Sequence, residues 1–149
     1  MGLYYFEEQQ YHKSLACFIK SLYIRTKEFG SESHPSCGDC LLNMGILYKR
    51  LGVPLRAFQA LTKALEIRRA LIGAHSLPTA AVLEELGKYH LEKGSYQPAY
   101  HCFQECYEIR KRILRKSACD EIQRVSCLLV YLHKQLEVEL RQREERLRD

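Results

Sequence analysis

The stretch LLNMGILYKRLG, residues 41–52, decides the fold because related segments stand both before and after it. Within it, Gly45 is followed by an aromatic residue three positions later and by Gly52 seven positions later. Similar segments begin at Gly2 and Gly87, which lie 43 residues before and 42 residues after Gly45. Self-similarity at a nearly fixed period predicts that the chain is built from copies of one small structural unit.

Residues farther along each unit support the repeat. Twelve residues after each glycine stands a small residue, and twenty-three residues after it an arginine follows an isoleucine. The small residues are Ser14, Ala57 and Ala99, and the arginines are Arg25, Arg68 and Arg110. The linkers also match, since GSESHP at 30–35 aligns with GAHSLP at 73–78.

Each unit is predicted to form two helices. The first begins near Pro35 or Pro78, because proline suits the opening turn of a helix, and it ends at a glycine that accepts a left-handed conformation. The second helix carries apolar residues at helical spacing and ends in basic residues, which complement the helix dipole. Small residues at Gly45 and Ala57 should let the two backbones approach closely. One hairpin cannot cover its own apolar face, so the units must stack.

This pattern resembles the tetratricopeptide repeat, and the long period, with Leu65-Glu66-Ile67-Arg68 before a glycine-to-proline linker, is similar to the kinesin light chain variety. The resemblance covers roughly residues 2–115. It implies an all-α fold, a right-handed superhelical stack of antiparallel helix pairs. We expect a single domain over 1–149, with these parts: truncated repeat 1 (1–34), repeat 2 (35–77), repeat 3 (78–117) and a long C-terminal capping helix (118–149).

The resemblance also implies a binding surface, because the first helix of each pair lines the inner face, where relatives bind peptides of other proteins. Asn43 matches a family asparagine that often hydrogen-bonds the backbone of a bound peptide. The predicted peptide-binding groove consists of Asn43, Ile46, Lys49, Arg50, Glu84, Glu85 and Lys88. Its mixed charge argues against a simple clamp for an acidic C-terminus. The alternative for each of these residues is an ordinary solvated helix face.

The two ends differ from the repeats. Residues 1–9 are expected to fray, because a short uncapped helix is marginal in water. Residues 120–148 are expected to form one helix with an apolar stripe of Ile122, Val125, Leu129, Leu132, Leu136 and Leu140. A helix with one polar face can close a solenoid. We therefore expect a monomer, with dimerisation through this helix as the alternative.

Composition limits the partners. The chain has 149 residues, of which 46% are hydrophobic and 28% charged, and its net charge of +5 is too small to predict a nucleic-acid partner. No apolar run reaches the roughly 18–20 residues that span a bilayer, and no secretory signal is visible, so we expect a cytoplasmic protein without a membrane partner. Seven cysteines without framework spacing fit free thiols in a reducing compartment.

Catalytic and metal chemistry finds little support. His34, Cys37 and Cys40 form an H-x-x-C-x-x-C pattern, but zinc usually needs a fourth ligand, and Cys40 corresponds to Val82 in the next repeat. No nucleophile–base pair, paired carboxylates or phosphate loop is evident, so no catalytic residue, metal or cofactor is expected. The sequence predicts a non-enzymatic interaction scaffold or adaptor. The alternative is a structural subunit docked through its outer face or its C-terminal helix.

Overall fold

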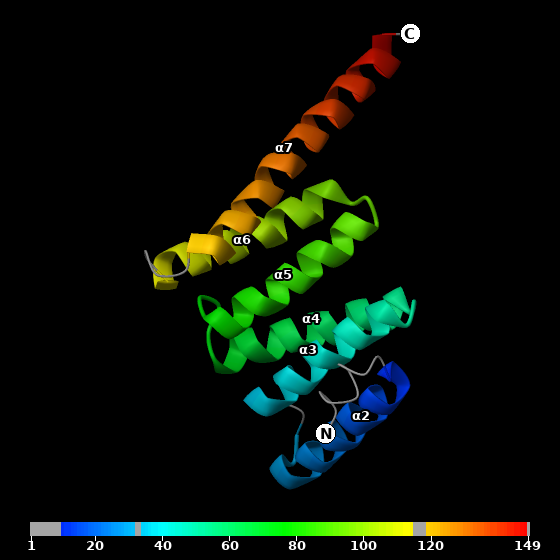
Figure 1. Cartoon of the computed structure of the whole chain (residues 1–149), viewed down its shortest axis with the longest axis vertical. Helices are drawn as coiled ribbons and strands as arrows, with labels where there is room; N and C mark the ends of the chain where they lie inside the picture. The colour runs from blue at the N-terminus through cyan, green and yellow to red at the C-terminus, as the bar shows by residue number, and fades with distance from the viewer. Residues whose placement is uncertain (1–9, 32–33, 115–118, 149) are drawn as a thin grey trace.

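The computed structural model describes residues 10–31, 34–114 and 119–148, and Figure 1 shows the helices stacked in chain order. Within these ranges the chain forms six α-helices and no strand. They are α2 (Tyr11–Phe29), α3 (Pro35–Arg50), α4 (Pro54–Leu71), α5 (Leu77–Glu92), α6 (Tyr96–Leu114) and α7 (Cys119–Arg148). The expectation that residues 1–9 fray lies outside the described residues.

Local chemistry sets the helix ends. At the start of α3 the His34 ring accepts a hydrogen bond from the Ser36 N–H, and at the start of α5 the Ser76 hydroxyl accepts one from the Thr79 N–H. Both side chains satisfy backbone donors that have no partner within the helix. The turns that follow α3 and α5 contain Gly52 and Gly94, with φ of 71° and 69°. Glycine adopts this left-handed conformation without a steric penalty.

The two helices of each pair approach closely at a glycine. A Cβ atom added to Gly45 in α3 would lie 2.7 Å from Cγ of Leu61 and 3.4 Å from the Ala57 carbonyl oxygen, both in α4. A Cβ atom at Gly87 in α5 would lie 2.9 Å from the ring of Phe103 in α6. The absent side chain leaves the space that a large residue of the second helix fills.

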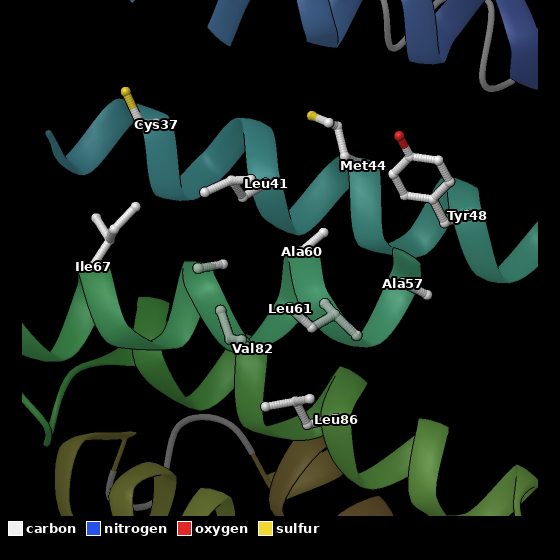
Figure 2. Packing of buried hydrophobic residues seen from close by; sticks show 11 residues of the cluster. Cys37, Leu41, Met44, Tyr48, Ala57, Ala60, Leu61, Ile67, Val82 and Leu86 are labelled. Atoms are coloured by element: carbon white, nitrogen blue, oxygen red, sulfur yellow. The ribbon is translucent and has the colours of Figure 1, made fainter. Parts of the chain in front are cut away.

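Successive pairs share their cores. Leu41, Met44 and Tyr48 of α3 lie over α4, and Val82 and Leu86 of α5 extend the same cluster from the other side (Figure 2). A hairpin therefore buries its apolar residues partly against its neighbour. The predicted all-α solenoid of antiparallel helix pairs is confirmed.

The last pair and α7 form a second core. Val125 and Leu132 of α7 are buried against α5 and α6 in a cluster with Phe103 and Ile109. Leu140 is 58% exposed, because the end of α7 extends past the rest of the stack (Figure 1). The predicted apolar stripe is thus buried in its first part and exposed in its last part.

The start of α7 keeps the repeat period. α3, α5 and α7 begin at Pro35, Leu77 and Cys119, so each start follows the previous one by 42 residues. Among the described residues, α7 packs on the second helix of the preceding pair, as α5 packs on α4. The sequence did not reveal this, because the apolar pattern of the repeats fades after residue 115.

The recurring arginines connect successive pairs. Arg25 at the end of α2 donates to the Ser36 carbonyl oxygen in the first turn of α3, at 2.7 Å. Arg68 at the end of α4 donates to the equivalent Pro78 carbonyl oxygen in α5. Arg110 at the end of α6 instead lies 3.6 Å from the Glu121 carboxylate in the first turn of α7. One side chain per pair thus fixes the next pair in place.

Candidate functional site

The first helices of two successive pairs form a recess. Its volume is about 360 Å³, and its described lining residues come from α3 and α5. These residues are Ile46, Lys49 and Arg50 of α3, and Glu85, Lys88 and Glu92 of α5. We call this surface the α3–α5 recess.

Ion pairs connect its two walls. The Lys49 ammonium lies 3.7 Å from the Glu85 carboxylate and 3.2 Å from that of Glu92. The Lys88 ammonium lies 2.8 Å from Glu85 and 2.9 Å from Glu84. Cations and carboxylates alternate around the recess, so its own charges largely neutralise one another. A bound segment with a single sign of charge would have to break these pairs.

The ion pairs continue beyond the recess into the core. Glu84 also meets the Arg110 guanidinium of α6 at 2.6 Å, and Arg110 in turn reaches Glu121 of α7. Burial by itself would raise the pKa of Glu84, but hydrogen bonds and charges from Lys88 and Arg110 outweigh burial and lower it. Burial alone would lower the pKa of Lys88, and the two glutamates raise it instead. Both groups are therefore ionised at neutral pH.

The structure brings five of the seven predicted groove residues to the recess, namely Ile46, Lys49, Arg50, Glu85 and Lys88. Asn43 is not among its lining residues, and its amide donates at 2.9 Å to the Asp39 carbonyl oxygen one turn earlier in α3. Glu84 is turned toward Arg110.

Glu92 was absent from the predicted set although it lines the recess. Its position carried a signal, because it follows Glu85 by two helical turns and occupies the place of Arg50 in the next repeat. Arg50 contacts α2: its guanidinium donates a hydrogen bond to the Tyr11 hydroxyl at 3.2 Å and lies over the Tyr11 ring. The start of α2 therefore borders the recess.

The H-x-x-C-x-x-C residues serve the packing of α2 on α3. The His34 ring stacks on Phe29 with centroids 3.7 Å apart, and Cys37 is buried in the first core. The buried thiol of Cys40 accepts a hydrogen bond from Arg25 at 3.0 Å. Among the described residues, no group of three or more His, Cys, Asp or Glu side chains could hold a metal ion.

A further hollow lies outside the recess. A hollow of about 640 Å³ runs along α7, but its described lining, Asp120, Gln123, Arg124, Cys127 and Leu128, comes from one helix face. Among the described residues it therefore brings no groups from different elements together. None of the described helices is long and apolar enough to cross a membrane.

Comparisons with known proteins agree with the helical pairs. The family model of the tetratricopeptide repeat matches residues 1–70 and 39–112, and the chain belongs to this family. Among solved structures it is similar to the crystal structure of BtubC (BKLC) from P. vanneervenii, with a TM-score of 0.81 and 21% sequence identity. The match covers 89% of this chain and 52% of BtubC, so this chain spans about half the length of that protein. No curated protein matched the sequence.

Proposed function

We propose that this chain is a non-enzymatic scaffold or adaptor that holds a peptide segment of a partner protein in the α3–α5 recess. The observation that carries the proposal is the convergence of side chains from two successive first helices on one recess. Tetratricopeptide repeats generally mediate protein–protein interaction, which makes a protein the expected partner.

The ion pairs favour a segment of mixed charge. A bound carboxylate would have to compete with Glu85 and Glu92 for the Lys49 ammonium, whose side chain is only 13% exposed. A segment with both a cation and a carboxylate would replace these pairs without leaving a charge unpaired. Glu92, whose side chain is 63% exposed, is the carboxylate most accessible to a bound cation. Ile46 offers an apolar contact beside these charges.

Affinity purification followed by mass spectrometry tests the proposal. The double variant Ile46→Gln with Lys88→Gln should lose partners that the parent chain retains, while its melting temperature stays close to the parent value. Lys93→Gln is the matched control, because Lys93 is an exposed lysine that directly follows α5 and does not line the recess. Recovery of the same partners by the double variant would contradict binding in the recess.

The second candidate is a structural subunit docked through α7. One observation favours it: Val138, Leu140 and Leu147 are exposed on the part of α7 that extends past the stack. In that case the double variant in the recess would recover the same partners as the parent chain, and deletion of residues 137–149 would abolish partner recovery. Either role is proposed for a monomer in the cytoplasm that binds protein and neither nucleic acid nor membrane.

A further inference from the structure

Lys49 is poorly placed to bind an anion of a ligand, although it lines the recess. Its ammonium lies between the carboxylates of Glu85 and Glu92, at 3.7 and 3.2 Å, and its side chain is only 13% exposed. Among the described residues, Lys49 is the only ion-pair partner of Glu92. A ligand that took the Lys49 ammonium would therefore leave Glu92 without a cation.

Lys88 is better placed, because both of its carboxylate partners have a second cation. Its ammonium lies 2.8 Å from Glu85 and 2.9 Å from Glu84. Glu85 also pairs with Lys49, and Glu84 also pairs with Arg110. The Lys88 side chain is 40% exposed, against 13% for Lys49. A bound anion can thus reach the Lys88 ammonium, and its capture leaves neither glutamate without a cation.

Glu84 has a further hydrogen bond open to it when Lys88 leaves. Its two oxygens have different partners, since Oε1 lies 2.9 Å from the Lys88 ammonium and Oε2 lies 2.6 Å from Nη2 of Arg110. The other terminal nitrogen of Arg110, Nη1, is buried and has no hydrogen-bond partner among the described residues. A buried donor without a partner is costly, so Oε1 gains by turning to Nη1. The result is a bidentate guanidinium–carboxylate pair, which is stronger than a single hydrogen bond.

This arrangement belongs to α5 and α6 and is not a general feature of the repeat. The positions equivalent to Lys88 hold Ile46 in α3 and Val130 in α7. In the preceding pair the recurring arginine, Arg68, takes its carboxylate from Asp39, which is not among the lining residues of the recess. A carboxylate shared between the recess and the recurring arginine therefore distinguishes the second pair from the first.

We propose that Lys88 is the residue of the recess that binds a carboxylate of the partner peptide, and that Glu84 then pairs with Arg110 alone. This assignment rests on the proposed function, because it concerns the same recess and the same partner. A carboxylate fits better than a phosphate group, since one ammonium faces the ligand and the charges of Glu85 and Glu92 repel a dianion more strongly. Arg110 is not among the lining residues and acts on the ligand through Glu84, as a positioning residue.

Titration with small carboxylates tests the assignment without a partner protein. The whole chain, with isotopically labelled lysine, is titrated with N-acetylglutamate amide, which has a side-chain carboxylate, and with N-acetylalanine, which has a chain-end carboxylate. N-acetylglutamine amide is the neutral control, and sodium chloride keeps the ionic strength constant. We expect the NMR signal of the Lys88 side chain, assigned with Lys88→Gln, to shift with a carboxylate and not with the neutral control. The signals of Lys49 and of the exposed Lys93 should stay in place, and the carboxylate that binds more tightly identifies the source.

Variants of the buried pair test the role of Arg110. Arg110→Lys keeps the charge but cannot form a bidentate pair with Glu84, so Lys88 should bind the carboxylate at least about fivefold more weakly, the lower end of typical coupling between sites. Adding Glu84→Gln removes the competing carboxylate and should restore the affinity, and Glu84→Gln alone should bind at least as tightly as the parent chain. Arg68→Lys is the matched control and should leave the affinity unchanged. Circular dichroism checks that each variant is folded.

The outcomes separate this assignment from the proposed function. A Lys88 signal that shifts with neither carboxylate, a larger shift of Lys49, or a stronger response to inorganic phosphate would overturn the assignment. So would an affinity that is the same in the parent chain, in Arg110→Lys and in the double variant. The proposed function fails on a different result, namely recovery of the same partners by the chain with Ile46→Gln and Lys88→Gln, whatever the titration shows.

Discussion

The Arg110 guanidinium of α6 lies 2.6 Å from the Glu84 carboxylate of α5, and the two side chains are 9% and 15% exposed. Glu84 also contacts Lys88 in the α3–α5 recess, and Arg110 contacts Glu121 of α7. This pair therefore joins the candidate binding surface to the helix that closes the stack. Two predictions concern it directly.

Loss of the Glu84 charge should destabilise the fold. Glu84→Gln removes the charge of the carboxylate closest to Arg110, and a hydrogen bond to a charged group contributes about 1.5–3 kcal/mol, against about 0.5–1.5 kcal/mol for a neutral one, so we expect a loss of roughly 1–2 kcal/mol. Urea denaturation monitored by circular dichroism measures the change in the free energy of unfolding. Glu92→Gln is the control, because its exposed ion pair should contribute less than about 1 kcal/mol. Equal effects of the two substitutions would contradict the structural role of the Glu84–Arg110 pair.

The same pair should make stability depend on pH. The pKa of Glu84 is lower in the folded chain than its ordinary value of 4.5, so the unfolded state binds more protons in this range. The stabilisation is fully present above pH 4.5 and is lost as the pH falls through the folded-state pKa. Urea titrations at successively lower pH should therefore show that the free energies of unfolding of the parent chain and of Glu84→Gln become equal in acid. If the two free energies of unfolding differed by the same amount at every pH, the Glu84 carboxylate would not be the source of the pH dependence.

Gly45 should not tolerate a side chain. In Gly45→Ala the new Cβ atom meets Leu61 at 2.7 Å, and overpacking of this kind typically costs about 1–3 kcal/mol, more than the roughly 1 kcal/mol that alanine gains in a helix. Leu61→Ala alone should cost about 2–5 kcal/mol. Since Leu61→Ala removes the atoms that clash, the two changes should be less than additive in thermal or urea unfolding. Full additivity would show that Gly45 and Leu61 are not in contact.

Thiol reactivity should distinguish the cysteines by their surroundings. Burial is the main cause that raises the pKa of Cys102 and of Cys106 to about 11. The reactive form is the thiolate, so both should resist alkylation in the folded chain at mildly alkaline pH. Cys127 is exposed on α7 and should react before Cys102 and Cys106. Iodoacetamide labelling read by peptide mass spectrometry, with and without urea, measures the order. Labelling of Cys106 as fast as Cys127 without urea would contradict the second core.

Removal of the end of α7 should leave the stack intact. Residues 137–149 follow the buried Val125 and Leu132, so their deletion should change the melting temperature little. Light scattering should give a monomer mass for both the parent and the shortened chain. A dimer that disappears on deletion would instead support association through α7.

The helical pairs could be read from the sequence because they depend on residues close together in the chain. Pro35, Ser76 and Gly52 act within one turn of a helix end, and the repeat at Gly45 and Gly87 marks where two helices meet. The resemblance carried by these residues placed all seven predicted groove residues on α3 and α5, and five of them line the recess. The amide of Asn43 donates to the backbone of its own helix.

Periodicity and capping, acting over a few residues, thus determined that this chain is an all-α stack of hairpins. Only the tertiary structure decided which charges meet across the helices: Lys49 with Glu92, Glu84 with Arg110 and Arg68 with Asp39. It also showed that Ile24 is exposed where Ile67 is buried. The reason is physical: side chains tens of residues apart pair according to the angle and offset between stacked helices, and no local pattern encodes those quantities.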